Sequence, residues 1–453
     1  MIRRRGSVFT LILMIALLSS CELFPGLLKS DDVQDTTGTF TAYSMATKKF
    51  YPVKVDLLAE NEVCLVYGEQ SAGISQITAQ AIALEYKNHI YSQITGAFGD
   101  FTDVDGNGKI ILFLLDIKDG YDATMASSYV AGYFHPLDMI ASGSNSNRAD
   151  MLYLDTNPGK PGSTEFYNTL AHELQHLINF SIRYNRGASI SQDVWIDEGL
   201  SSAAEYIYSK TRGIGYNQGK IDFFNTAATQ NSAIREGNNF FTWTEDAYVY
   251  DEYVTAYLFF QWLRIHAAAS LGGDGTGIYK AIINSAHLNE TAVTDAVKTI
   301  DPKLDSWDKI LEAWILANYI NAKTGLYGYR GEISTNITPS SYSTVKLYPG
   351  EGVFSALSRT GFFIPSNADT GVRYIKVSKA GELTYIDDWG SYTGTSGDHL
   401  LTFNTSLTDR KTGHLTGAWS AALPVDADPS PAARSVDTPQ KPYPIDFRPT
   451  LPF

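Results

Sequence analysis

The sequence predicts an α+β protein made of a mixed sheet with helices, a mainly helical lobe, and a β-rich C-terminal domain arranged as a sandwich. Three observations support this order. Strand-like runs around one helical segment fill residues 39–160, and long segments with helical spacing fill 161–325. After Lys323, stretches rich in Gly, Ser and Thr separate short alternating runs. At 453 residues, with 44% hydrophobic and 19% charged residues, the chain is long enough for two or three folded domains.

Residues 1–20 have the layout of a signal peptide. Three arginines precede an apolar run from Val8 to Leu18, which is too short to span a bilayer as a permanent helix. The small residues before Cys21 resemble a bacterial lipobox, so we expect cleavage before Cys21 and lipidation of its thiol; the alternative is a plain secretory signal. The protein is therefore expected to be exported to the bacterial cell envelope and lipid-anchored to a membrane, with residues 21–38 as a tether.

The charge of the chain argues against polyanionic partners. The formal net charge is -14, and loss of the signal peptide would remove three arginines and make it more negative. Such a chain is a poor candidate for nucleic acid, and its own charge would not hold it at an anionic membrane. Cys64, in the apolar stretch VCLVY, is expected to pack as a small buried side chain.

The N-terminal part, 39–160, alternates strands with one helix. Ile74 to Ile94 is predicted to be an amphipathic helix. Its expected apolar face is Ile77, Ala81, Leu84 and Ile90. The expected strands are FTAYSM, YPVKVDLL, VCLVYG, the apolar run that follows Lys109, and ADMLYLD.

The loop DVDGNGK before the fourth of these strands has a calcium-loop pattern. Asp103, Asp105 and Asn107 stand at alternate positions with Gly108 after them, as in the first half of such a loop. The match ends where a bidentate glutamate is needed, because that position is Leu114. We interpret the loop as a tight polar turn feeding a buried strand, with Ca2+ as the less favoured alternative.

The helical part, 161–325, begins with a helix from Thr164 to Tyr184, capped by Ser163 or Thr164. A second helix is expected from Val194 to Lys210, a third from about Tyr253, and helical spacing continues to about Ala322. The β domain is expected over 333–423. Residues 424–453 contain eight prolines and are expected to form an extended tail.

The helix 164–184 contains TLAHELQHLINF, in which two histidines are four residues apart. On a helix, His172 and His176 face the same way one turn apart and can bind one metal ion. Glu173 is offset by about 100 degrees, so its carboxylate can reach a metal-bound water without being a ligand. The pattern predicts a Zn2+ site with Glu173 as general base.

A catalytic zinc site needs a third protein ligand and an open position for water. The segment VWIDEGLSSAAEYIYS offers Glu198, and Glu205 lies two helical turns further on the same face. We interpret Glu198 as the ligand and Glu205 as a carboxylate that orients a histidine, with Glu205 held as the alternative ligand.

HExxH followed by WIDEGLSSAAE resembles the gluzincin metallopeptidases, in which two histidines and the glutamate of the second motif hold zinc. Together with FGDFTDVDGNGKIILFLLDI, YVAGYFHPLD and SNSNRADMLYLD, these motifs resemble the hyicolysin family of bacterial metallopeptidases over roughly residues 60–320. The resemblance implies a gluzincin-like domain, zinc ligands His172, His176 and Glu198, and Glu173 as the base.

The same resemblance implies an oxyanion donor and a substrate-binding strand. Tyr253, in YVTAYLFFQWL, takes the position of the gluzincin tyrosine, with Tyr248, Tyr250 and His266 as competitors. The strand Ala149 to Asp155 is expected to bind the substrate backbone by strand addition. His135, a lone histidine in GYFHP, is interpreted as structural.

The expected function is that of a zinc-dependent metalloendopeptidase that hydrolyses peptide bonds in proteins outside the cytoplasm. An endopeptidase is preferred to an aminopeptidase because residues 140–155 contain no glutamate-rich amine-binding motif. The alternative hypothesis is a surface-anchored lipoprotein that binds partners through its β domain, with a vestigial or structural zinc site.

Overall fold

The computed structural model describes residues 37–124, 129–140, 145–187, 192–215, 217–228, 234, 240–241, 243, 249–340, 344–356, 362–363, 369–386, 391–392, 397–409, 411–414 and 444–445. The predicted signal peptide, Cys21 and Tyr248 lie outside these residues. So do most of the predicted tether and all of the predicted tail except 444–445.

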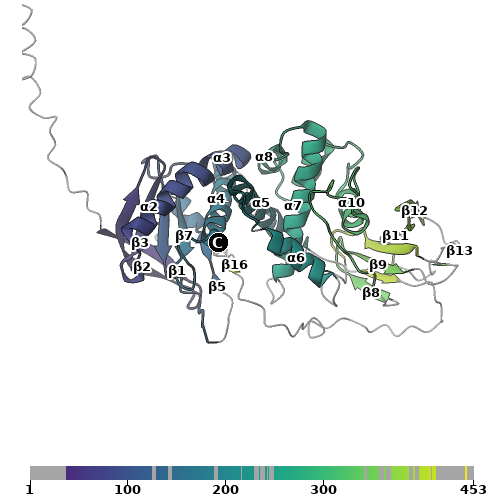
Figure 1. Cartoon of the computed structure of the whole chain (residues 1–453), viewed down its shortest axis with the longest axis horizontal. Coiled ribbons are helices and arrows are strands. Elements are labelled where there is room, and N and C mark those ends of the chain that lie inside the picture. The colour runs from purple at the N-terminus through teal and green to yellow at the C-terminus, as the bar shows by residue number, and fades with distance from the viewer. Residues whose placement is uncertain are drawn as a thin grey trace, which may run out of the picture.

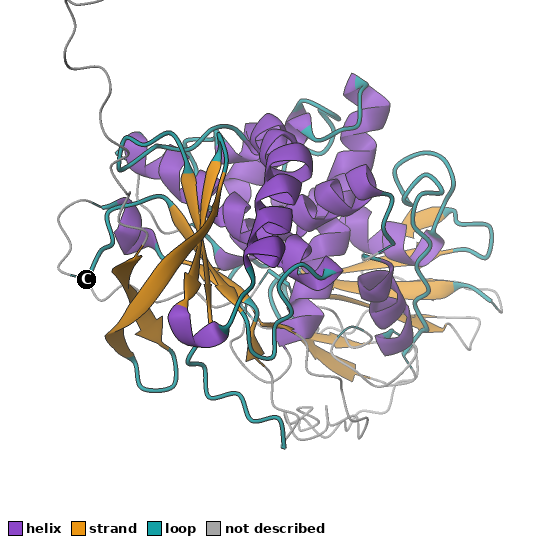
Figure 2. Cartoon of the chain, turned by 60° about the vertical axis from the view of Figure 1, so that its left-hand side comes forward, coloured by secondary structure: helices purple, strands orange, loops and turns teal. Residues whose placement is uncertain are grey.

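The N-terminal part is built on a six-stranded mixed sheet with the order β1-β2-β3-β4-β7-β6 (Figures 1 and 2). Its central strands β3, β4 and β7 are parallel, and β1, β2 and β6 pair antiparallel to their neighbours. The bounds are β1 Thr37–Ser44, β2 Lys49–Glu60, β3 Cys64–Glu69, β4 Ile110–Leu115, β6 Gly132–Phe134 and β7 Met151–Asp155. The strands predicted in this part are confirmed.

Burial of β4 explains its uninterrupted apolar sequence. All six residues of IILFLL are buried, because both faces of the sheet are covered at this point. Leu112 and Leu114 belong to the large core shared with the helices, whereas Ile111, Phe113 and Leu115 belong to a smaller core on the other face. Figure 2 shows the helices gathered on one side of the twisted sheet.

The helix expected over Ile74 to Ile94 is present, but of its predicted apolar face only Ile90 is buried. It runs as α2 Gln76–Glu85, a π-helical segment Tyr86–Tyr91, and α3 Ser92–Phe98. Ile77 and Leu84 are 79% and 58% exposed, and Ala81 is also exposed. Besides Ile90, the buried residues of this segment are Ala79, Ile82, Ala83, Tyr86, Ile94, Ala97 and Phe98. The helix carries apolar residues on several of its faces, so their spacing alone could not show which face is buried.

The helical lobe contains α4 Thr164–Asn185, α5 Val194–Arg212, α6 Gln218–Ala227, α7 Val249–Leu271, α8 Gly277–Ile283, α9 Glu290–Lys298 and α10 Trp307–Ile320. Helix α4 packs on β6 and β7, and α5 packs between α4 and α7. Ser163 caps α4, since its hydroxyl oxygen accepts a hydrogen bond from the N–H of Phe166 at 3.2 Å. The predicted helices are confirmed, and α6 is an element that the sequence interpretation did not name.

The C-terminal part consists of small antiparallel sheets, which confirms the predicted α+β order. A four-stranded sheet has the order β12-β11-β14-β9, beside the pairs β15-β8 and β10-β13. The bounds are β8 Thr344–Leu347, β9 Gly352–Ala356, β10 Phe362–Phe363, β11 Val372–Val377, β12 Leu383–Tyr385, β13 Ser391–Tyr392, β14 His399–Asn404 and β15 Lys411–His414. A short strand β16, Pro444–Ile445, pairs with β5, Tyr129–Val130.

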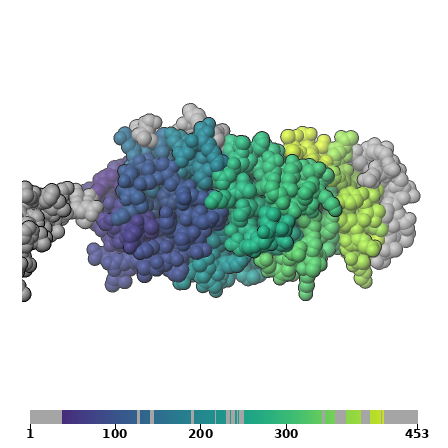
Figure 3. Space-filling view, turned by 90° about the horizontal axis from the view of Figure 1, so that it is seen from above, coloured from purple at the N-terminus to yellow at the C-terminus, as the bar shows by residue number. Residues whose placement is uncertain are grey.

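The four-stranded sheet shares its core with α10. Phe354, Ile375 and Leu401 belong to the same buried cluster as the helical lobe. The ring of Tyr319 stacks on Phe354 with ring centroids 4.1 Å apart. Figure 3 shows the three parts following one another along the long axis of the molecule.

Cys64 is the first residue of β3, has no exposed surface and forms no disulfide among the described residues. Burial raises the pKa of its thiol to about 12, so the side chain behaves as a small apolar group, as expected. Among the described helices, none has the length and apolar character needed to cross a membrane.

Candidate metal centre

Helix α4 holds its polar motif on a buried face. Leu170, Leu174 and Leu177 have no exposed surface and anchor the helix in the core. His172 and His176 are only 3% and 6% exposed, although imidazole is a polar group. A buried polar side chain must find partners, so the contacts of both rings define what this face of the helix can do.

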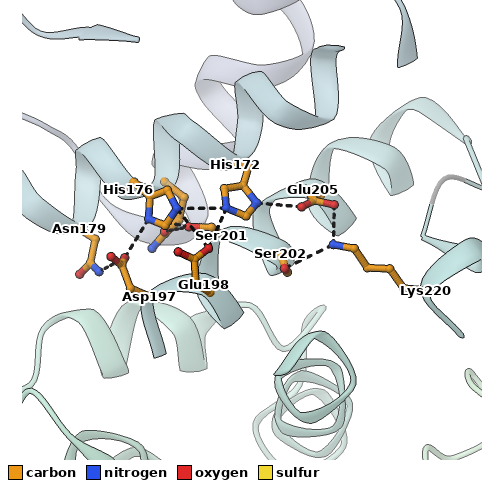
Figure 4. A network of polar contacts seen from close by, with 10 residues as sticks. His172, His176, Asn179, Asp197, Glu198, Ser201, Ser202, Glu205 and Lys220 are labelled. Atoms are coloured by element: carbon orange, nitrogen blue, oxygen red, sulfur yellow. Dashed lines mark hydrogen bonds and ion pairs between the residues drawn. The ribbon is translucent and has the colours of Figure 1, made fainter. Parts of the chain in front are cut away.

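The two imidazoles and one carboxylate converge from two helices (Figure 4). The Nε2 atoms of His172 and His176 are 3.1 Å apart. Oε2 of Glu198, from the first turns of α5, lies 3.2 Å from Nε2 of His172 and 3.5 Å from Nε2 of His176. Glu198 is 2% exposed, so the three donors form a group shielded from bulk water.

Gly199 explains how α5 carries Glu198 to this position. A Cβ at Gly199 would lie 2.3 Å from ring atoms of Phe260 on α7, far inside van der Waals contact. Only glycine permits this approach of α5 to α7. Gly199, which directly follows Glu198, is therefore required for α5 to pack closely against α7.

The other ring nitrogen of His172 is held by a carboxylate. Nδ1 of His172 lies 2.8 Å from Oε1 of Glu205, and Nζ of Lys220 on α6 lies 2.8 Å from Oε2 of the same carboxylate. Burial acts to raise the pKa of Glu205, but the Lys220 ammonium and His172 outweigh it and hold that pKa below its usual value. Glu205 is thus an ionised hydrogen-bond acceptor on the outer side of the ring, as the orienting role requires.

His176 has a parallel arrangement. Its Nδ1 lies 3.2 Å from Oδ1 of Asp197 and 3.1 Å from Oγ of Ser201. The Ser201 hydroxyl donates to Oε1 of Gln175, so its oxygen is available to accept from His176. Asn179 donates to Asp197 and fixes that carboxylate in turn.

The contacts of the two imidazole rings show that His172, His176 and Glu198 can bind a metal ion. Because acceptors surround both Nδ1 atoms, each neutral ring carries its proton there and directs the Nε2 lone pair toward Glu198. Two lone pairs and a carboxylate facing one another repel unless a cation lies among them. The ligand atoms of His172, His176 and Glu198 all lie within 4.8 Å of one another. Two imidazoles and one carboxylate are a donor set of catalytic zinc sites, so the residues fit Zn2+.

Glu173 is 1% exposed and lies beside this group on the face of α4 that meets the sheet. A Cβ at Gly132 of β6 would lie 2.7 Å from Cγ2 of Thr169 and 3.2 Å from Cγ of Glu173. The glycine lets the outermost strand lie directly against the turn of α4 that carries Glu173.

This arrangement corrects one expectation. The strand predicted to bind substrate by its edge, Ala149 to Asp155, contains β7, which pairs on one side with β4 and on the other with β6. Both edges of β7 are therefore paired, and this strand cannot add a substrate strand. The edge strand next to α4 is β6, which the sequence did not single out because Gly132–Phe134 is too short to show alternation.

The candidates for the oxyanion donor that lie among the described residues are all on α7. Tyr253 lies in the first turns of α7, half-buried, with its ring 4.9 Å from that of Trp243. Its competitor Tyr250 packs edge-on against Phe223. Nε2 of His266 is 3.0 Å from the carbonyl oxygen of Gly328, and burial lowers the pKa of this histidine, as expected for a core residue. His135 is 3% exposed and packs against Phe50, which agrees with a structural role.

Several residues around the site were not assigned a role from sequence. Asp197 and Ser201 are four residues apart on α5, on either side of Glu198, and this spacing could have pointed to a shared partner. Lys220 had no such signal, because only the tertiary placement of α6, which packs on α7, brings it to Glu205.

Comparison with known proteins agrees with this chemistry. The chain is 29% identical over 314 residues to the neutral metalloprotease ShpI of Staphylococcus hyicus, covering 67% of this chain and 68% of that protein. No family model matches the chain. An M1 zinc metallopeptidase structure from Deinococcus radiodurans overlaps 60% of this chain and 51% of its own, about half, with 14% identity and a TM-score of 0.32. That structural overlap is too weak to support any argument. The sequence similarity to ShpI shows that the chain is similar to a known metalloprotease.

Proposed function

We propose that the protein is a zinc-dependent metalloendopeptidase, a lipoprotein relative of the hyicolysin family, that hydrolyses peptide bonds in proteins outside the cytoplasm. The observation that carries the proposal is the buried convergence of His172, His176 and Glu198, with Glu173 one residue along the same helix. The similarity to a neutral metalloprotease supports the same reaction class.

The proposed mechanism assigns each side chain one task. His172, His176 and Glu198 hold the ion, and Glu205 and Asp197 keep the two imidazoles in the orientation that binding needs. Zinc in such a site supplies a Lewis acid and lowers the pKa of water toward neutrality. The Glu173 carboxylate takes the proton of the attacking water and gives it to the leaving amine.

The hydroxyl of Tyr253 is proposed to stabilise the oxyanion that forms on the substrate. This role is supported by the position of Tyr253 at the start of α7, the helix that packs on the ligand helix α5. Tyr253→Phe is expected to lower kcat about 10²- to 10³-fold with little change in KM, because the bond forms chiefly in the transition state. Steady-state kinetics on one peptide substrate measure this, and Tyr250→Phe, which removes the hydroxyl of the competing candidate, is measured beside it. Equal activity of Tyr253→Phe and wild type would assign the donor elsewhere.

The activity itself is tested with casein or a peptide mixture and the purified protein. Cleavage is expected, its loss after treatment with a zinc chelator, and its return when one equivalent of Zn2+ is added back. Mass spectrometry of the products should show internal cleavage sites, as an endopeptidase requires. Folded, zinc-loaded protein that cleaves nothing would contradict the proposal and favour the binding lipoprotein.

The lipid anchor is proposed from the lipobox-like residues before Cys21. Cys21→Ser is expected to move the protein from the membrane fraction to the soluble fraction, because acyl chains on Cys21 would be its means of attachment. Fractionation of cells with immunodetection measures the shift. A wild-type protein that is already soluble would remove the anchor from the proposal.

A further inference from the structure

A second group of possible metal ligands lies on the loop between α3 and β4. The loop is the tight polar turn expected from sequence, with Gly106 and Gly108 at φ of +74° and +72°. Oδ1 of Asp103 accepts the N–H of Gly106 at 2.9 Å, and its Oδ2 accepts the N–H of Gly108 at 2.9 Å. Oδ1 of Asp105 accepts the N–H of Asn107 at 3.1 Å. The turn is therefore shaped around its own carboxylates.

Asp150, the residue before β7, lies against this turn from another part of the chain. Its side chain is 1% exposed, and its Oδ1 accepts the N–H of Val104 at 3.0 Å. Its Oδ2 is buried without a hydrogen-bond partner. One oxygen from each of Asp103, Asp105 and Asp150 lies within 4.8 Å of the other two. The buried Asp150 carboxylate, one oxygen of which has no hydrogen-bond partner, thus lies close to two further carboxylates.

The charges make this arrangement costly without a cation. Lys109, the cation within the loop, pairs with Glu60 on β2. Asp150 is 1% exposed, so water screens its charge only weakly, and its carboxylate lies close to those of Asp103 and Asp105. A divalent cation would satisfy the unpaired oxygen and remove the repulsion together.

We propose that Asp103, Asp105 and Asp150 bind one Ca2+ ion, in a site separate from the zinc centre. Asp103, Asp105, Asn107 and Gly108 occupy the first, third, fifth and sixth positions of a calcium loop. Leu114 stands where that loop needs its last carboxylate, and Asp150, the residue before β7, supplies a carboxylate instead. An all-oxygen donor set of irregular arrangement suits Ca2+, which accepts varied coordination geometries, better than Mg2+, which demands near-octahedral geometry.

The site is connected to the catalytic helix. The N–H of Thr102 donates to Oγ of Ser181 on α4 at 2.8 Å, and Nδ2 of Asn185 donates to Oγ1 of Thr102 at 2.6 Å. The ion would therefore stabilise the junction between the calcium loop, β7 and the C-terminal half of α4. Its effect is on stability, so it does not depend on the proposed peptidase activity.

The test uses the full-length protein loaded with one equivalent of zinc and freed of calcium. Isothermal titration with CaCl2 is expected to give one site per chain with a Kd of roughly 10⁻⁵ to 10⁻³ M. Saturating Ca2+ is expected to raise the Tm by about 3–4 °C, and equal MgCl2 to raise it much less. Asp150→Asn should abolish both responses, because asparagine keeps the shape and the acceptor for Val104 but removes the charge.

Two further variants make the result decisive. Asp103→Asn is expected to lose calcium binding in the same way and serves if Asp150→Asn does not fold. Asp301→Asn is the matched control, since Asp301 accepts the N–H of Lys303 in a turn outside the acidic group. No heat of calcium binding, an equal effect of Mg2+, or a full response in both Asp150→Asn and Asp103→Asn would overturn the proposal.

Discussion

Glu173→Gln is expected to lower kcat/KM for a peptide substrate by about 10²- to 10⁴-fold while one zinc ion per chain stays bound. Glutamine has nearly the shape of glutamate but cannot accept the proton of the attacking water. Glu173 is outside the group formed by His172, His176 and Glu198, so its replacement leaves the ligands in place. Peptide kinetics together with metal analysis of the same preparation measure the two quantities.

The control for this experiment lies on the same helix. Glu165 is in the first turn of α4 and is exposed, so Glu165→Gln changes the same chemistry at a site away from the metal group. It should keep wild-type kcat/KM and zinc content. Glu173→Gln protein that retains zinc and more than a tenth of wild-type activity would show that another group accepts the proton.

The zinc group was predictable from sequence because most of its geometry is local. The turn between His172 and His176 is fixed by the helix, and Glu198 follows only 22 residues after His176. The choice between Glu198 and Glu205 needed the structure, since both lie on one face of α5. The position of Glu205 at Nδ1 of His172, away from Nε2, depends on how α5 crosses α4.

The sequence alone could not predict contacts between elements that are far apart in the chain. Asp150 reaches the loop at Asp103 because β4 and β7 are parallel neighbours, a pairing that no local pattern encodes. The same limit applies to Lys220 beside Glu205. It also explains the wrong face of the helix after Ile74, where apolar residues on all sides left the choice to tertiary packing.

Glu198→Ala is expected to abolish stoichiometric zinc binding, whereas Glu205→Ala should retain zinc with an affinity reduced about 10- to 100-fold. Glu198 contributes a donor atom to the group, but Glu205 acts through Nδ1 of His172. Competition with a chromogenic zinc chelator measures both affinities. Loss of Glu205 also leaves the buried Lys220 ammonium without its carboxylate, so Glu205→Ala should lower the Tm as well.

The double variant Glu205→Gln with Lys220→Met separates these two effects. It removes both buried charges together, and glutamine can still accept a hydrogen bond from Nδ1 of His172. Its Tm should exceed that of Glu205→Ala, because no uncompensated charge remains, and its zinc affinity should lie between those of Glu205→Ala and wild type. If Glu198→Ala instead bound zinc normally and both Glu205 variants lost it, the third ligand would be Glu205, and α5 would have to turn relative to α4 in the zinc-bound protein.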